Sequence, residues 1–199
     1  MRVLVACEYS GRVREAFRRL GHDAWSCDLL PADDGSPYHY QGDVLTLLNL
    51  DGKWDLMIAH PPCTHLAVSG ARWFKDKQTE QAEALEFVRK LLDAPIPKIA
   101  LENPVSIISS KIRKPDQIVQ PYEYGDPFSK KTCLWLKGLP KLKPTYIVQP
   151  NIKTYVGKSG KVTRFSADYG WSSNTKRNVT YQGIADAMAE QWGSPHTNN

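Results

Sequence analysis

The sequence predicts an α/β fold built on one mainly parallel sheet. Apolar runs typical of buried strands alternate with amphipathic helical patterns through the first half of the chain. Strands separated by helices of this length form βαβ units. The chain has 199 residues, of which 41% are hydrophobic and 24% are charged. That length suits one domain with a sizeable core, so we expect a single domain over residues 1–199.

The first predicted unit is a strand, a helix and a second strand. Residues 2–7, RVLVAC, have the apolar character of a buried strand. Residues 11–21 are predicted to be a helix that ends at Gly21. One face of this helix carries apolar residues at the i, i+3, i+4, i+7 spacing, namely Val13, Ala16, Phe17 and Leu20. Residues 23–30 are predicted to be the second strand, and residues 31–37 a loop rich in Pro, Asp and Gly.

Further strands and the longest helix follow in the middle of the chain. Residues 54–60, WDLMIAH, are predicted to be a buried strand that the next two prolines terminate. Residues 79–94 are predicted to be the longest helix. Its core side is expected to carry Leu85, Val88, Leu91 and Leu92. Residues 98–103, KIALEN, and 132–138, TCLWLKG, are two more predicted strands.

The character of the chain changes from Pro140 onward, where Pro, Lys, Thr and Tyr dominate. Residues 155–165, YVGKSGKVTRF, are predicted to form a hairpin around residues 157–160. Residues 180–193 are predicted to be a short helix. One side of that helix is expected to carry Ile184, Ala187, Met188 and Gln191.

Positive charge is concentrated in one part of the chain. The net charge is +5, yet the segment from Lys111 to Arg177 alone holds 14 Lys or Arg against 4 acids. The rest of the chain is therefore slightly acidic. A basic segment on an acidic body suggests a polyanionic partner such as nucleic acid. The alternative is a solvated basic surface with no partner.

The four cysteines are dispersed and form no CxxC pair, so we expect free thiols and no metal site. Cys7, Cys27 and Cys133 lie in apolar strand-like runs and are predicted to be small core residues. Cys63 differs, because it follows Pro61 and Pro62 directly after a predicted strand.

Polar residues follow several predicted strands, and the carboxyl ends of parallel strands meet at one edge of a sheet, where ligands bind. The residues concerned are the turn CEYSGR at 7–12, Asp28, Asp43, Cys63 and the pair Glu102-Asn103. A small-residue turn followed by an acid about 20 residues on fits a nucleoside cofactor, whose ribose hydroxyls the acid would hold. The turn lacks the G-x-G-x-x-G pattern of a dinucleotide site. Glu102 directly follows a buried strand, so its carboxylate needs a partner or a ligand.

In this order, these residues resemble the catalytic domain of the DNA cytosine-5 methyltransferases, in the compressed form of small phage-type members. The resemblance matches the family's cofactor motifs to Cys7, Glu8, Tyr9, Ser10, Gly11, Asp28 and Asp43. It matches the Pro-Cys nucleophile motif to Pro62 and Cys63, and the Glu-Asn motif to Glu102 and Asn103.

The resemblance implies the Rossmann-like fold of class I S-adenosylmethionine-dependent methyltransferases. It implies S-adenosyl-L-methionine as cofactor and DNA as partner. A small basic insertion at about residues 141–180 stands where the family has its target-recognition domain. From the basic segment we expect Lys130, Lys131 and Arg164 to contact the substrate.

The implied reaction suits the residues. Carbon 5 of cytosine is a poor nucleophile, and a thiolate that adds to carbon 6 activates it. This chemistry needs an accessible cysteine near a carboxylic acid that hydrogen-bonds the ring nitrogen. We expect Cys63 to be the nucleophile and Glu102 to anchor the base, with Pro62 and Asn103 completing the catalytic set.

Several alternatives stay open on the sequence alone. The same chemistry on single-stranded DNA or on a free pyrimidine nucleotide fits the short insertion. A nucleic-acid-binding homologue with weak catalysis fits the thin glycine motif. Cys63 is otherwise a buried thiol, or part of a Cys-His hydrolase with His60 or His65. Aromatic residues suited to stack a base are Trp73, Phe74 and Trp171.

An amino-methyltransferase is disfavoured. Those enzymes place an aromatic residue after a Pro-Pro pair and Asp, Asn or Ser before it, where this chain has Cys63 and His60. The sequence also lacks a run of about 20 apolar residues, and its first residues do not read as a secretory signal. We therefore expect a cytoplasmic protein, with no membrane partner. The sequence does not indicate the oligomeric state.

Overall fold

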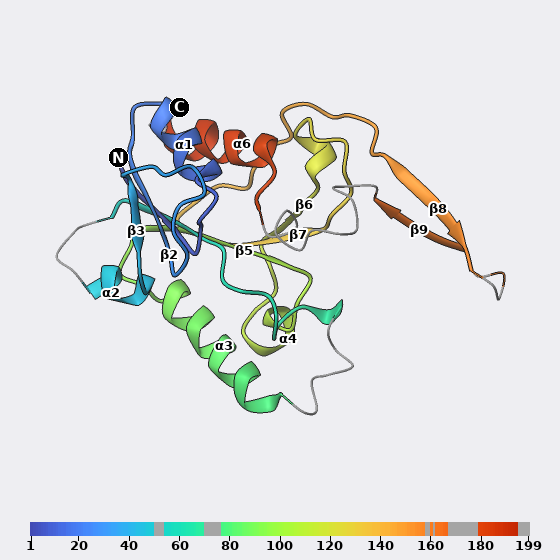
Figure 1. The fold of residues 1–199 in the computed structure, drawn as a ribbon, viewed down its shortest axis with the longest axis horizontal. Coiled ribbons are helices and arrows are strands. Elements are labelled where there is room, and N and C mark those ends of the chain that lie inside the picture. The colour runs from blue at the N-terminus through green and yellow to red at the C-terminus, as the bar shows by residue number, and fades with distance from the viewer. Residues whose placement is uncertain (50–53, 70–76, 158–159, 161, 167–178, 195–199) are drawn as a thin grey trace.

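A seven-stranded sheet forms the centre of the molecule (Figure 1). The computed structural model describes residues 1–49, 54–69, 77–157, 160, 162–166 and 179–194. The strand order across the sheet is β3-β2-β1-β4-β5-β7-β6. In chain order the strands are β1 (Arg2–Ala6), β2 (Asp23–Asp28), β3 (His39–Gln41), β4 (Leu56–Ala59), β5 (Lys98–Pro104), β6 (Gln117–Val119) and β7 (Thr132–Lys137).

The sheet is mainly parallel, as the sequence predicts. Strand β1 pairs in parallel with β2 and β4, and β3 and β5 extend the parallel set outward. Strand β7 runs antiparallel between β5 and β6. Its first residue, Thr132, pairs with Pro104 at the end of β5. The chain just before β7 therefore reaches the same sheet edge as the carboxyl ends of the parallel strands.

Helices cover both faces of this sheet (Figure 1). Helices α1 (Arg12–Arg19) and α6 (Gln182–Gly193) pack on one face, against Val3, Val5, Leu56 and Ile58. Helix α3 (Gln78–Leu92) packs on the other face with the short helices α2 (Val44–Asn49) and α4 (Ile108–Lys111). No helix within the described ranges is long and apolar enough to cross a membrane.

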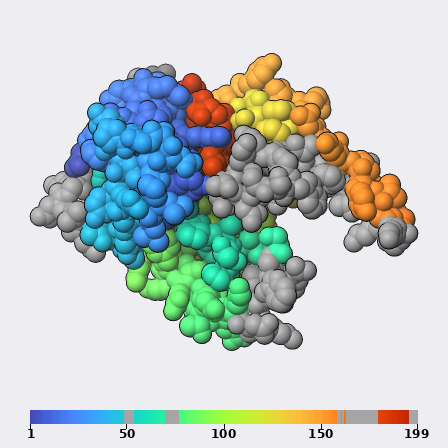
Figure 2. All heavy atoms as spheres, viewed as in Figure 1, coloured from blue at the N-terminus to red at the C-terminus, as the bar shows by residue number. Residues whose placement is uncertain are grey.

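The predicted hairpin is present and projects from the body of the molecule (Figures 1 and 2). Strands β8 (Ile152–Val156) and β9 (Val162–Ser166) pair antiparallel and form a two-stranded sheet of their own. All five residues of β8 are exposed. Isolated two-stranded hairpins are marginally stable in water. We call strands β8 and β9, with the residues that join them, the arm.

Most of the predicted core residues are buried, one prediction is wrong and one is met only in part. Leu20 is 50% exposed, because α1 ends at Arg19 and Gly21, with φ of +82°, turns the chain before Leu20 can face the core. Cys7 is only half-buried. It follows the last residue of β1 in a left-handed conformation, with φ of 59°, and packs against the edge of the core on the α3 face. Cys27 and Cys133 are buried, as predicted.

Candidate active site

A cavity of about 430 Å³ opens at the sheet edge where the parallel strands end. Its walls include Asp28 after β2, Cys63 after β4 and Glu102 in β5. Lys130 enters the wall from the segment before β7, and Tyr181 from the start of α6. The cavity thus collects side chains that lie far apart in the sequence, because parallel strands deliver their ends to one edge.

The loop that carries Cys63 is fixed by backbone hydrogen bonds at both ends. His60 N–H donates to Ala6 O at 2.9 Å, which continues the β4 pairing by one residue. The next carbonyl, of Pro61, accepts a hydrogen bond from the side-chain amide of Asn103 at 2.9 Å. Past the prolines, the Cys63 carbonyl accepts bonds from two later amide groups in a turn. Asn103 is 1% exposed and therefore shielded from solvent. Its role here is to position the loop that carries Cys63.

Glu102 and His60 form a pair in the wall of the cavity. The His60 Nδ1 and Glu102 Oε2 atoms are 3.1 Å apart, and the two side chains are 9% and 17% exposed. Burial alone would raise the pKa of Glu102. The hydrogen bond and charge of His60, together with Lys130, outweigh burial and lower that pKa below its ordinary value. Glu102 is therefore a carboxylate at neutral pH in the free protein.

The Cys63 thiol faces the same charges with the opposite result. Burial raises the pKa of Cys63, the charge of Glu102 raises it further, and Lys130 lowers it. Because the raising effects prevail, Cys63 is a thiol at neutral pH in the free protein. The ammonium group of Lys130 also lies 5.7 Å from the centre of the Tyr181 ring. Lys130 is thus the cation whose charge favours the thiolate.

A second cavity of about 490 Å³ shares Cys7, Asp28 and Pro62 with the first. Its lining includes four acids, Asp28, Asp43, Glu80 and Glu83, and no Lys or Arg among the described residues. Burial, together with Asp28, Cys27 and Asp43, raises the pKa of the Cys7 thiol to about 12. The negative potential of this cavity suits a cationic ligand and opposes a phosphate group.

Asp28 and Asp43 hold their own loops with one carboxylate oxygen. Asp28 Oδ1 accepts the Leu30 amide at 3.0 Å, and Asp43 Oδ1 accepts the Leu45 amide at 2.9 Å. Both side chains line the second cavity. Two carboxylates at successive strand ends therefore converge on one space, as the sequence analysis expects.

Some residues of the turn after β1 line a cavity, and others have structural roles. Cys7 and Tyr9 line the first cavity, whereas Glu8, Ser10 and Gly11 line neither cavity. Glu8 is 4% exposed and accepts the amides of Val13 and Arg14, at 2.7 and 3.2 Å. These are N-terminal amides of α1 that have no partner within the helix. Glu8 therefore caps α1, a role that its place in a cofactor motif does not reveal.

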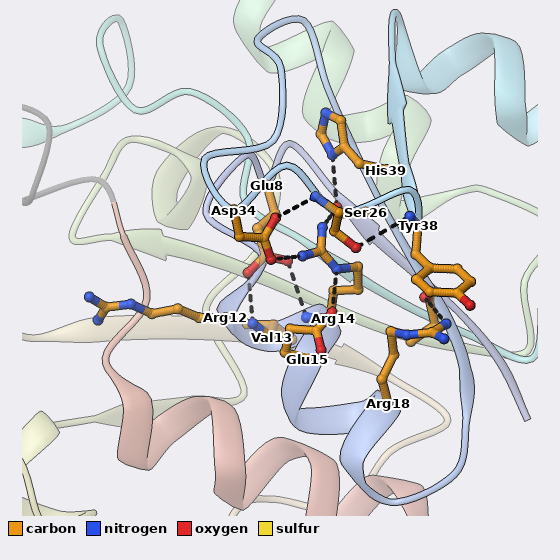
Figure 3. Close-up of polar contacts among 12 residues, drawn as sticks. Glu8, Arg12, Val13, Arg14, Glu15, Arg18, Ser26, Asp34, Tyr38 and His39 are labelled. Carbon is orange, nitrogen blue, oxygen red and sulfur yellow. Dashed lines mark hydrogen bonds and ion pairs between the residues drawn. The ribbon is translucent and has the colours of Figure 1, made fainter.

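A buried arginine locks this turn to the loop after β2 (Figure 3). Arg14 is fully buried and donates to Ser26 Oγ at 2.8 Å and to the carboxylate of Asp34. Gly11 has φ of +72°, and a Cβ there would run into the Arg14 guanidinium. The turn needs glycine at this point for packing, and the network holds the loop that follows Asp28.

The remaining predicted residues lie outside the two cavities. Lys131 is exposed beside Lys130. Arg164 is in β9, where it pairs with Thr154 across the hairpin. Trp73, Phe74 and Trp171 lie outside the described residues. The sequence-based prediction does not include the contact between His60 and Glu102. The pattern that could have indicated it is a histidine at the end of one buried strand and a carboxylate at the end of the next.

No known family model and no curated protein sequence matches this chain. Solved structures do match its fold. One is an E. coli protein provisionally named a DNA modification methyltransferase encoded within a prophage, with a TM-score of 0.53 and 18% identity. The match covers 75% of this chain and 52% of that one, so this chain spans about half the length of its neighbour.

At this identity the likeness concerns the fold alone. It agrees with the seven-stranded sheet, its single antiparallel insertion and the helices on both faces. The chain has the α/β fold of the class I S-adenosylmethionine-dependent methyltransferases. The predicted fold class is confirmed.

Proposed function

We propose that this protein transfers a methyl group to carbon 5 of cytosine in DNA, through a covalent bond between Cys63 and the base. The main support is the shared cavity in which a cysteine and a carboxylate stand next to an acidic, cofactor-sized space. The solved neighbour's name, a DNA modification methyltransferase, agrees with this class of reaction.

The second cavity fits S-adenosyl-L-methionine better than a dinucleotide. S-adenosylmethionine carries a sulfonium charge and supplies an electrophilic methyl group when it is bound. A lining with four acids and no described Lys or Arg favours such a cation and disfavours a pyrophosphate. Asp28 and Asp43 would hold the nucleoside, and Cys7 would line the passage to the first cavity.

In the first cavity, the chain's own residues would carry the activation of the base. Cys63 loses its thiol proton to water as its Sγ atom forms a bond to carbon 6, and ring nitrogen N3 takes a proton from the side of Glu102. Asn103 keeps the Cys63 loop in place through Pro61. After methyl transfer the carbon 5 proton leaves to water, and the S–C6 bond breaks with its electron pair returning to Cys63.

The basic hairpin favours DNA over a free nucleotide. Residues 141–166 hold six Lys or Arg and no acid, and β8 is exposed along its whole length. A two-stranded ribbon of this kind suits a nucleic-acid groove. We assign the phosphate contacts to Lys130 and Lys131, before β7, and to Lys153, Lys158, Lys161 and Arg164 in the basic segment. The target cytosine would be flipped out or single-stranded, because a base inside a duplex cannot reach a thiol at a sheet edge.

The test is to trap the covalent bond. DNA in which 5-fluorocytosine replaces cytosine is incubated with the wild-type protein and S-adenosylmethionine. Fluorine cannot leave as the proton does, so a stable adduct is expected on the peptide that contains Cys63, detected by mass spectrometry. Cys63→Ser should give no adduct. Without any wild-type adduct on duplex DNA, single strands or nucleotides, the proposal is wrong.

The same experiment separates the alternatives. Adducts only with single strands or only with free nucleotides would move the reaction to that substrate. Calorimetry with S-adenosylmethionine measures whether the protein binds the cofactor. Binding of DNA without binding of the cofactor would instead favour a nucleic-acid-binding homologue that has lost the chemistry.

A further inference from the structure

His60 lies in the wall of the first cavity, close to two acidic side chains. Its Nδ1 atom is 3.1 Å from Glu102 Oε2. Its Nε2 atom is buried, with no hydrogen-bond partner among the described residues. The second acidic side chain is Glu8: burial raises its pKa, and the charge of His60 partly offsets that rise.

The contact between His60 and Glu102 holds one proton. A carboxylate can only accept, so when Glu102 is ionised the proton must be on His60 Nδ1. When Glu102 is protonated, its O–H donates to the same nitrogen. The two arrangements differ only in the place of one proton, and the 3.1 Å separation allows it to cross.

The reaction proposed above needs the second arrangement at one moment. In the free protein Cys63 is a thiol and Glu102 a carboxylate, because burial and Glu102 raise the pKa of Cys63 while His60 and Lys130 lower the pKa of Glu102. Attack by the thiolate requires a proton at the ring nitrogen, on the side of the base that Glu102 faces. A carboxylate has no proton to give, so the proton must come from a group behind it.

We propose that His60 is a positioning residue that orients Glu102 and supplies Glu102 with the proton that it passes to N3 of the base. The proposal rests on the proposed function. As the S–C6 bond forms, the Cys63 thiol gives its proton to water. One proton moves from Nδ1 of a His60 imidazolium, which keeps its other proton on Nε2, to the Glu102 carboxyl group and from there to N3. When the S–C6 bond breaks, the proton returns by the same route. No electrons or further reactants are needed, because the Cys63 electron pair makes and later leaves the S–C6 bond.

Charged groups from three elements lie near the His60–Glu102 pair. Glu8 faces it from the β1–α1 turn, Glu102 from β5, and Lys130 from the segment before β7. Cys63 follows three residues later on the same loop. The mechanism therefore predicts a rate that depends on the proton held between His60 and Glu102.

The test compares His60→Asn with the wild-type protein. The Asn amide occupies the place of Nδ1 and still donates to Glu102, but it cannot release a proton. With duplex DNA and saturating cofactor, kcat should fall on the order of 10²-fold, the usual contribution of a general acid. KM for DNA should stay within about twofold, because orientation of Glu102 is kept. The pH profile of kcat should change, because the pair no longer holds a proton that can be transferred. His22→Asn, a histidine near the N-terminus and away from both cavities, is the matched control.

A second measurement does not depend on turnover. In protein labelled with ¹⁵N-histidine, the His60 signals are identified by their loss in His60→Asn. The Nδ1 proton should be protected from exchange with water, and Glu102→Gln should shift the Nδ1 resonance. No shift in that variant would overturn the pairing. A wild-type kcat and an unchanged pH profile in His60→Asn would overturn the proton role.

These results are distinguishable from failure of the proposed function. If the wild-type protein forms no adduct with 5-fluorocytosine, the cytosine chemistry is wrong, and the destination of the proton goes with it. The NMR result would then still decide whether His60 and Glu102 share a proton. An adduct in the wild type with a normal His60→Asn enzyme would keep the function and remove His60 from it.

Discussion

The sheet edge and the hairpin are built in opposite ways. At the sheet edge, the side chains that could react or bind a ligand follow strands that are themselves buried. All four residues of β4, which leads to Cys63, are buried. In the hairpin, all five residues of β8 are exposed, and neither hydrophobic core includes a described residue of the arm.

The difference suggests how the two regions divide the work. A side chain after a buried strand is fixed by its neighbours, which suits a reaction that needs atoms in one geometry. The arm has an exposed strand β8 and a sequence rich in Lys and Arg, which suits long-range attraction to phosphates that tolerates movement. Changes in one region should therefore leave the activity of the other intact, and the following predictions test that separation in order of expected effect.

The largest expected effect is on DNA affinity when the arm loses its charge. Replacing Lys153, Lys158, Lys161 and Arg164 together by Gln should make the negative slope of log Kobs against log [salt] shallower by about 3.6, at about 0.9 for each lost phosphate contact. Fluorescence anisotropy with labelled duplex DNA over a salt series measures this. The melting temperature and the affinity for S-adenosylmethionine should not change, because the arm lies outside both hydrophobic cores.

The control removes the same charge elsewhere on the molecule. Gln at the exposed positions Lys77, Lys90, Lys111 and Lys114 should leave most of the salt slope in place. If both sets of substitutions lowered the slope equally, DNA binding would depend on total charge, and the arm would have no special part in it.

Most of the sheet could be predicted from the sequence, because its strands carry long apolar runs. Strand β3 (His39–Gln41) could not. It is three residues long, polar and largely exposed, and it exists through backbone pairing with Ser26, Cys27 and Asp28. Strand β6 (Gln117–Val119) is equally short and depends on its pairing with β7. Such strands have no local pattern, because a distant partner determines them.

For the candidate site too, part could be predicted from the sequence and part could not. The strand-end positions of Asp28, Cys63 and Glu102 follow from the order of strands in a parallel sheet, so the sequence predicts their convergence. The pairing of Glu102 with His60 spans 42 positions and depends on the β4–β5 register. The capping of α1 by Glu8 depends on the path of one turn. These contacts are set by three-dimensional geometry, which residue types alone do not give.

A smaller effect is expected on cofactor affinity when the sheet edge loses Asp28. Asp28→Ala should weaken S-adenosylmethionine binding by about 1.5–3 kcal/mol, the usual worth of a hydrogen bond that involves a charged group. Isothermal titration calorimetry measures it. DNA affinity should stay the same, since the arm is unchanged. Asp23→Ala is the matched control: Asp23 starts the same strand at the opposite edge of the sheet. Equal losses in both variants would mean that the cavity at Asp28 does not hold the cofactor.

The smallest expected effect is on the reactivity of Cys63, which reports the charges inside the cavity. Because burial and Glu102 raise the pKa of this thiol, alkylation by iodoacetamide should reach half its maximal rate above the ordinary thiol value of about 8.5. Glu102→Gln removes a charge that disfavours the thiolate, so the midpoint should move to lower pH. Lys130→Met removes a charge that favours it, so the midpoint should move to higher pH.

Each midpoint shift should stay within about one pH unit, because Cys63 is only half-buried and water screens the charges. Mass spectrometry of the Cys63 peptide separates this thiol from Cys7, whose pKa is raised to about 12. Lys131→Met, which removes the neighbouring exposed lysine, should leave the midpoint where it is. Opposite shifts in the Glu102 and Lys130 variants require both charges to act on Cys63 directly. If both variants moved the midpoint in one direction, the cause would be a general opening of the cavity, and the sheet edge would be less rigid than its buried strands imply.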